Sequence, residues 1–136
     1  SGNLDRIQIV KGWLDGEAVQ RERVYNVTWS GSRRLNDKGE LPPVGNTVDA
    51  AKASYDNAIG AAELAAFWSD PEFDPKQPAF YYVRVLEIPT PRWSTFDAVE
   101  LGMEVPGGLP TSIQERAFTS PIWYQPEKKA AAGKAR

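Results

Sequence analysis

Two polar clusters in the second half of the chain carry side chains suited to holding an anion. Arg92 precedes Trp93, and Glu115 precedes Arg116. An arginine guanidinium binds a carboxylate, sulfate or phosphate through two parallel hydrogen bonds, and an adjacent tryptophan can stack on a sugar or an aromatic ring. Alternatively, the two arginines form ion pairs with Asp97 or Glu115 and fix a loop to the rest of the fold. We predict that a surface facing a substrate or another domain includes Arg92, Trp93, Asp97, Glu115 and Arg116.

Carboxylates form a second group of candidates. Asp70, Glu72 and Asp74 alternate along the chain and could ligate calcium, which takes six to eight oxygen ligands. The glycine and the closing glutamate of an EF-hand loop are absent, so a turn whose aspartates accept backbone N–H bonds is favoured. Asp97 and Glu115 could in principle form a glycosidase pair, but nothing in their spacing supports that role.

The chain has no histidine and no cysteine. It therefore cannot build a Ser-His-Asp triad, a Cys-His pair or a zinc site with histidine or cysteine ligands. We predict no catalytic residue, no metal ligand and no cofactor site in this chain.

Length and charge limit the function further. The 136 residues, 41% of them hydrophobic, are enough for one domain with a core. A net charge of -2 gives no general attraction for nucleic acid or for an anionic membrane. No apolar run approaches the roughly 18 to 20 residues of a membrane span. We expect neither kind of partner, and neither the compartment nor the oligomeric state can be predicted.

The elements that must position these residues read mostly as strands. Residues 7–13 and 23–30 alternate apolar and polar side chains, and the turn at Asp15-Gly16 predicts a hairpin between them. Residues 30–46 are rich in turn formers and predict a long loop. In residues 47–68 the alanines favour a helix, whereas alternation and Gly60 favour two strands. We favour the strands.

The second half contains the clearest strand, residues 80–88, which is apolar on both faces and therefore predicts a central position. We expect Tyr81, Val83 and Val85 to point into the core, and Arg84 to need a carboxylate partner if it is buried. A short helix is expected over residues 94–101, with Ser94 or Thr95 as its cap, and a strand over residues 114–124.

Together these elements predict a mainly β fold: an antiparallel, β-sandwich-like single domain with long Pro/Gly-rich loops and one short helix. We place the domain at residues 3–126 and expect a disordered basic tail at residues 127–136. Trp29, Trp68 and Trp123 lie in or beside strand-like runs and are expected in the core. Trp93 lies in an irregular stretch, which leaves open an independent carbohydrate- or anion-binding module.

Five segments, in this order, resemble one known family. They are LDRIQIVKGWLD, PPVGNTVD, WSDPEFDP, AFYYVRVLEIPTPRWST and QERAFTSPIWY. They are similar to the C-terminal region of a large bacterial family of unknown function, whose N-terminal part resembles metal-dependent phosphoesterases of the polymerase-and-histidinol-phosphatase (PHP) type. The resemblance covers roughly residues 3–126.

This resemblance implies a non-catalytic C-terminal β-domain of a longer, hydrolase-like protein, and the start at Ser1-Gly2 without methionine agrees with it. The implied partner is the N-terminal domain of the same parent protein. In such phosphoesterases a divalent metal is bound mainly by histidines and carboxylates of that N-terminal part, so no metal ligand carries over to this chain. The substrate is not implied.

Overall fold

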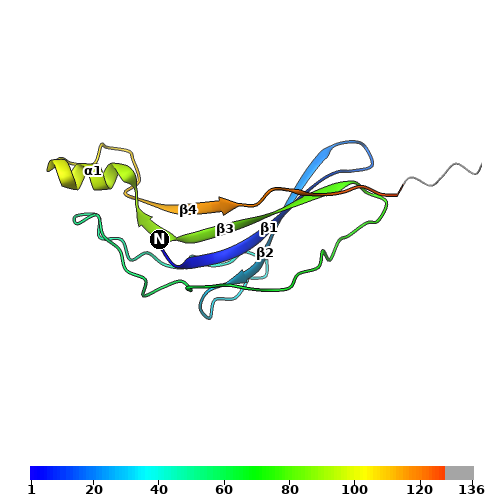
Figure 1. The fold of residues 1–136 in the computed structure, drawn as a ribbon, viewed down its shortest axis with the longest axis horizontal. Helices are drawn as coiled ribbons and strands as arrows, with labels where there is room; N and C mark the ends of the chain where they lie inside the picture. The colour runs from blue at the N-terminus through cyan, green and yellow to red at the C-terminus, as the bar shows by residue number, and fades with distance from the viewer. Residues whose placement is uncertain (128–136) are drawn as a thin grey trace, which may run out of the picture.

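The structure, a computed structural model, describes residues 1–127. Its elements are β1 (Leu4–Leu14), β2 (Gln20–Trp29), β3 (Ala79–Pro91), α1 (Trp93–Leu101), β4 (Ser112–Phe118) and β5 (Ile122–Tyr124). The strands form one antiparallel sheet in the order β2-β1-β3-β4, and β5 pairs with the start of β3 (Figure 1). The predicted mainly β, antiparallel architecture with one short helix is confirmed, as are the hairpin and the central strand.

Alternation along the paired strands defines two faces of the sheet at its hairpin end. The pairing of β1 with β2 and β3 puts Ile9, Lys11, Tyr25, Tyr81 and Val83 on one face, which we call the covered face. It puts Val10, Gly12, Val24, Phe80 and Tyr82 on the opposite face, which we call the open face. The two faces differ in what lies over them.

The covering layer is the connection from β2 to β3, residues 30–78. It runs from the end of β2 to the end of the molecule where α1 lies, then returns along one side of the sheet to the start of β3 (Figure 1). On its return, the Trp68 ring packs against Tyr25 and Tyr81, with ring centroids 5.1 and 6.4 Å away. In a β-sandwich a second sheet would cover this face. In the described residues the irregular connection covers it instead.

Residues 47–68 form neither the favoured strands nor a helix, so that prediction was wrong. Their backbone groups are bound by side chains instead: Asp49 Oδ1 accepts from the amide of Ala51 at 3.0 Å, and the Thr47 hydroxyl donates to the Asp56 carbonyl at 2.7 Å. Ladder pairing is limited to isolated bridges, one of them between Leu4 and Ala61. Short polar side chains compete with regular structure in this way, and alanine content does not report it.

The helix was predicted correctly, but its cap was not. Arg92 is the N-cap residue, with φ -68° and ψ 152°, and no side chain caps the helix. The Thr95 hydroxyl lies within the first turn and donates to the Thr111 carbonyl at 2.8 Å. The helix buries only its small residues Ser94, Thr95 and Ala98, and it lies beyond the end of the sheet (Figure 1).

The predicted strand over residues 114–124 is two strands, β4 and β5, with residues 119–121 between them. The expected basic tail lies outside the described residues, apart from Glu127. Within the part of the chain that the structure describes, no helix has the length and apolar character needed to cross a membrane.

The buried core is small. Its apolar members are Val10, Leu41, Ala53, Ala79, Leu86, Ile88 and Ala98. Tyr81, Val83 and Val85, which were expected to point into the core, are only half-buried. Many larger apolar side chains are exposed, among them Trp93, Phe96, Leu101, Phe118, Ile122 and Trp123. The expectation that Trp123 belongs to the core was wrong, because the open face on which it lies has no second layer.

Candidate functional site

The covered face contains a buried lysine. Lys11 lies on β1, and its side chain is only 3% exposed. Its Nζ donates to Asp70 Oδ2 at 2.5 Å and to the Glu72 carbonyl at 2.9 Å. The Tyr81 hydroxyl donates to the same Asp70 oxygen at 2.7 Å. A buried charge is tolerated when it is paired and hydrogen-bonded, and this one is both.

Glu72 extends the same network toward solvent. Its carboxylate accepts hydrogen bonds from Arg23 and from the Tyr25 hydroxyl. Asp74, the third carboxylate of the alternating run, accepts from the amide of Lys76 at 2.8 Å. No group of three or more His, Cys, Asp or Glu residues placed to hold a metal ion occurs in residues 1–127. The run forms a turn whose first two carboxylates bind basic side chains of the sheet.

The pKa shifts follow from these contacts. Burial alone would raise the pKa of Asp70, but hydrogen bonds from Lys11 and Tyr81 outweigh it and the pKa is lowered. Burial, followed by the hydrogen bond to Glu72, raises the pKa of Tyr25 to about 12. Burial and the bond to Asp70 also raise the pKa of Tyr81. These hydrogen bonds fasten the connection to the sheet.

A second internal cluster joins the opposite end of the sheet to the connection. Asp5 is fully buried and accepts hydrogen bonds from Arg33 at 2.7 Å, Arg6 at 3.0 Å and Gln114 at 2.9 Å. Gln114 also donates to the carbonyl of Glu87. These bonds tie β1, β3, β4 and the connection together, so Gln114 has a structural partner and is not available to a ligand.

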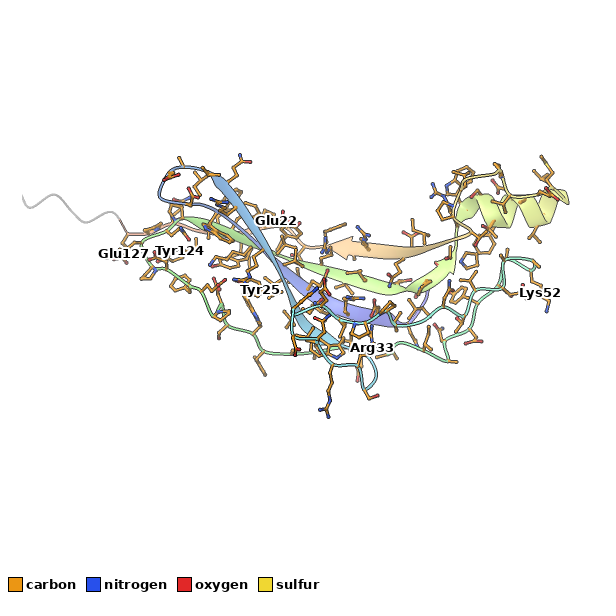
Figure 2. All side chains as sticks on the ribbon, turned by 180° about the vertical axis from the view of Figure 1, so that it is seen from behind. Glu22, Tyr25, Arg33, Lys52, Tyr124 and Glu127 are labelled. Carbon is orange, nitrogen blue, oxygen red and sulfur yellow. The ribbon has the colours of Figure 1, made fainter. Side chains whose placement is uncertain are left out.

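The open face is a contiguous aromatic surface. Ring centroids of Phe118 and Tyr82 lie 6.2 Å apart, those of Tyr82 and Phe80 6.4 Å, and those of Phe80 and Trp123 5.2 Å. The side chains come from β4, β3 and β5, and Figure 2 draws the side chains of the described residues on the ribbon. Trp123 is 66% exposed and Phe118 58% exposed. We call these four residues the aromatic row.

Gly12 is required for this arrangement. It pairs with Phe80 across β1 and β3, and a Cβ placed on Gly12 would lie 2.2 Å from Phe80 Cζ. The phenyl ring therefore lies flat on the glycine backbone, which is a known way to shield a glycine in a sheet. Val10, the next residue on this face of β1, is fully buried although no second layer lies over it.

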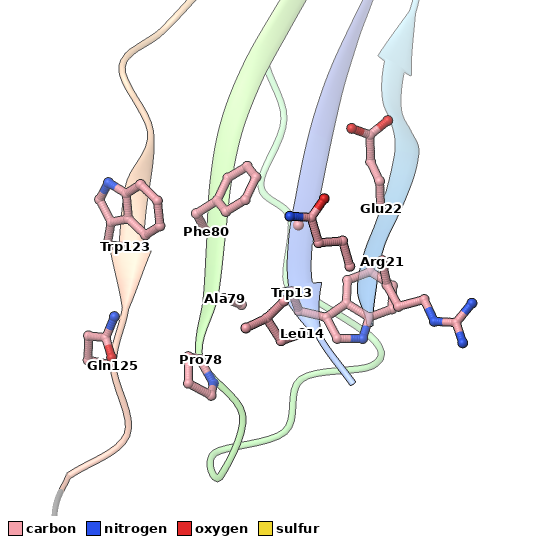
Figure 3. A pocket seen from close by; sticks show the side chains of 11 residues that line it. Trp13, Leu14, Arg21, Glu22, Pro78, Ala79, Phe80, Trp123 and Gln125 are labelled. Atoms are coloured by element: carbon pink, nitrogen blue, oxygen red, sulfur yellow. The ribbon is translucent and has the colours of Figure 1, made fainter. Parts of the chain in front are cut away.

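A groove runs beside the aromatic row at the hairpin end. Its volume is about 680 Å³, and it is lined by Gly12, Trp13, Leu14, Gln20, Arg21, Glu22, Pro78, Ala79, Phe80, Trp123 and Gln125. Trp123 forms one wall and Glu22 the other, with Phe80 between them (Figure 3). The volume lies within the roughly 300 to 1,000 Å³ of small-molecule sites.

A polar row crosses the open face next to the aromatic row. Arg84 Nε donates to Gln8 Oε1 at 2.9 Å, and Gln8 Nε2 donates to Asn26 Oδ1 at 2.8 Å. The partner of the half-buried Arg84 is therefore an amide and not the expected carboxylate. The amide suffices because the guanidinium is only partly removed from water.

The predicted site residues fall into two places. Arg92, Trp93 and Asp97 lie at or on α1, whereas Glu115 and Arg116 lie on β4 and line a shallow groove of about 610 Å³. Arg116 pairs with Leu86, five residues before the end of β3, so about 15 Å of strand separates the two groups. Within residues 1–127 no ion pair joins any of the five, so the alternative of a pinned loop gains no support.

The aromatic row was missed in the sequence. Phe80 and Tyr82 are two residues apart in the strand predicted over residues 80–88, so alternation puts them on one face, and Trp123 was expected to be buried. The alternation predicts that these side chains share a face, but it does not predict that the face lacks a cover. A glycine opposite Phe80 was the available signal for a ring lying on the sheet.

Fold and site together define a small, mainly β domain with one covered and one open sheet face. The chain belongs to the family described as "Protein of unknown function (DUF3604)", whose family model matches residues 1–126. No curated protein matches the chain, and no solved structure matches it.

Proposed function

We propose that residues 3–126 form a non-catalytic accessory domain of a longer, hydrolase-like protein and that the open face docks on the rest of that protein. The observation that carries the proposal is the aromatic row, four large rings side by side with no layer over them in residues 1–127. Isolated exposed apolar residues are ordinary, but a contiguous apolar surface is typical of an interaction site.

The accessible surface area of the chain is larger than that of a compact monomer of its mass, as the docking proposal requires. The accessible surface is 10013 Å², whereas a compact monomer of 15.1 kDa is expected to expose about 7,100 Å². The excess is larger than the roughly 800 Å² that one partner contributes to an interface of standard size.

The chemistry of the open face also fits docking. Interface centres are enriched in aromatic residues and arginine, and this face carries the aromatic row together with Arg84. The polar row satisfies the Arg84 Nε and the Gln8 amide nitrogen internally, whereas the terminal N–H groups of Arg84 remain available to acceptors of the partner. Docking therefore favours a partner surface that carries a carboxylate or carbonyl groups opposite Arg84.

On this proposal Arg92, Trp93, Asp97, Glu115 and Arg116 face the missing part or its substrate, and any divalent metal belongs to that part. The test is a metal-supplemented hydrolysis screen of phosphate and sulfate esters, run on this chain and on the complete protein that contains it. We expect turnover by the complete protein only. Turnover by this chain alone would overturn the proposal.

The groove beside Trp123 favours a second candidate, an independent carbohydrate-binding module. An exposed tryptophan offers a stacking surface, and Gln20, Glu22 and Gln125 line the same groove with groups that hydrogen-bond hydroxyls. Titrating this chain with soluble oligosaccharides while following tryptophan fluorescence tests it. Saturable binding that Trp123→Ala abolishes would favour the module over the accessory domain.

A further inference from the structure

We propose that the first turn of α1 is a binding site for a tetrahedral oxyanion, a phosphate or sulfate group, held by Arg92 and Ser94. The site is built entirely from this chain and does not depend on the docking proposed above. The helix α1 lies at the end of the sheet away from the β1–β2 hairpin turn (Figure 1), whereas the groove beside Trp123 is lined by residues next to that turn.

The first observation is an unused guanidinium. No hydrogen bond or ion pair from the Arg92 side chain is found within the described residues, and its Nε is buried without a partner. Its terminal nitrogens are not among the buried unpartnered atoms, so they reach solvent. The other buried basic side chains of the fold are paired: Lys11 binds Asp70, and Arg33 binds Asp5.

The second, independent observation is a buried hydroxyl. Ser94 is 5% exposed, and its Oγ has no hydrogen-bond partner within the described residues. Leaving such a group unpaired costs roughly 1 to 3 kcal/mol, so a hydroxyl that is buried without a partner in residues 1–127 is suited to bind a ligand oxygen. The Cα–Cβ bonds of a helix tilt toward its N-terminus. The Ser94 side chain is therefore directed to the same end as the free amides of the first turn.

Those amides complete the donor set. The amides of Thr95 and Phe96 are bound to the Arg92 carbonyl at 2.9 and 3.3 Å, but no partner for the amides of Trp93 and Ser94 is found in residues 1–127. The first turn also has no acidic residue, so no carboxylate of the helix occupies the site. A helix N-terminus favours negative charge.

The donors match a tetrahedral anion better than a planar one. The Arg92 guanidinium can donate two parallel N–H bonds, and the Ser94 hydroxyl and the Trp93 and Ser94 amides each donate one more in a different direction. Together these donors can bind three oxygens of one ligand. A carboxylate has only two oxygens. Because no hydrogen bond holds the Arg92 side chain, it can rotate to admit the anion to the buried hydroxyl.

The test is a ¹H–¹⁵N NMR titration of the labelled chain with sodium phosphate, sulfate and acetate at constant ionic strength. We expect saturable shifts of the Trp93 and Ser94 amides and of Arg92 Nε–H with phosphate and sulfate. Acetate should bind at least about threefold more weakly, since it loses one acceptor oxygen. Equal binding of acetate would overturn the tetrahedral assignment, and no saturable shift up to 100 mM salt would overturn the site.

Variants assign the binding to these residues. Arg92→Gln should weaken phosphate binding about tenfold or more, because charge-assisted bonds are lost, whereas Arg34→Gln, at an exposed arginine of the connection, should leave it unchanged. Ser94→Ala should weaken binding about fivefold without lowering the melting temperature, because its hydroxyl loses no partner within the described residues. Shifts that persist in Arg92→Gln, or that weaken equally in Arg34→Gln, would overturn the proposal.

Discussion

The two faces of the sheet share β3 and differ in what lies over them. On the covered face, Lys11, Tyr25 and Tyr81 bind two carboxylates of the connection that lies over them. The open face carries four aromatic rings in a row, with no layer over them in the part of the chain that the structure describes. A charged network is thus buried on one face, while large apolar rings are left to solvent on the other.

This inversion distinguishes structural residues from interaction residues. Lys11 and Asp70 resemble an active-site pair by burial and charge, but Lys11 Nζ makes two hydrogen bonds and the Asp70 carboxylate accepts three within the fold. Within residues 1–127 the aromatic row makes no polar contact, and no other layer covers its rings. We infer that the covered face holds the domain together and that the open face is where it meets its partner.

The largest expected effect comes from removing the lysine. Lys11→Met should lower the free energy of unfolding by about 3 to 5 kcal/mol, because it leaves the Asp70 carboxylate buried without its counter-charge. Chemical denaturation measures the change. Lys52→Met is the control, since Lys52 is 78% exposed in its ion pair with Asp49 and should change stability by less than about 0.5 kcal/mol.

The double variant Lys11→Met with Asp70→Asn sharpens the comparison, because removing both charges should recover much of the loss. Additive losses would show that the two side chains do not act as a pair.

The next largest effect is the difference in stability between alanine substitutions of two tryptophans that lie on opposite faces of the sheet. Trp68→Ala should cost about 3 kcal/mol, since Trp68 packs between Tyr25 and Tyr81 and holds the connection on the sheet. Trp123→Ala should cost less than about 1 kcal/mol in this chain, because its ring is mostly exposed. Thermal melts of the two variants measure the difference, and equal losses would remove the distinction between the faces.

A smaller effect is expected from Gly12→Ala. The new Cβ collides with the Phe80 ring, so the ring must lift from the sheet and expose Val10. We expect a loss of about 1 to 3 kcal/mol and stronger binding of a hydrophobic dye. The control is Gly16→Ala, where a Cβ meets nothing within 4 Å; a similar loss there would show that backbone effects dominate.

The smallest effects depend on pH. The pKa of Tyr25 is raised to about 12 from 10.0, so its contribution to stability is complete below pH 10 and is lost as pH rises from 10 to 12. The pKa of Asp70 is lowered from 3.8, so its contribution is complete above about that pH and is lost as pH falls through the lowered pKa. Melting temperatures against pH for the wild-type chain and Tyr25→Phe should differ in slope only above pH 10. An unchanged alkaline slope in the variant would contradict the burial of Tyr25.

The sequence predicted the individual strands better than it predicted which segments pack on each face of the sheet. Alternation located the hairpin and the central strand, because side-chain direction has a period of two in any strand. It could not predict the irregular path of residues 47–68, since that path depends on bonds such as Asn3 to Asn57 between distant segments. It likewise placed Phe80 and Tyr82 on one face but not Trp123 beside them, because that depends on β5 pairing with β3.

The candidate site was predicted only in part. Arg92 was selected for its anion-binding chemistry, and its guanidinium has no partner within the described residues. Ser94 was expected to cap the helix, and only the structure shows its hydroxyl buried without a partner. The grouping of these donors depends on burial in three dimensions, which cannot be derived from residue spacing.

The most direct test of the central claim is side-chain oxidation footprinting of the aromatic row. Hydroxyl radicals oxidise exposed rings, so oxidation of Trp123 and Phe118 is compared between this chain and the complete protein, with Trp68 as the internal reference. We predict at least about fivefold slower oxidation of both residues in the complete protein, with Trp68 unchanged, as expected for rings buried at the centre of an interface. Equal oxidation rates in the two proteins would show that the open face stays open and would contradict the docking account.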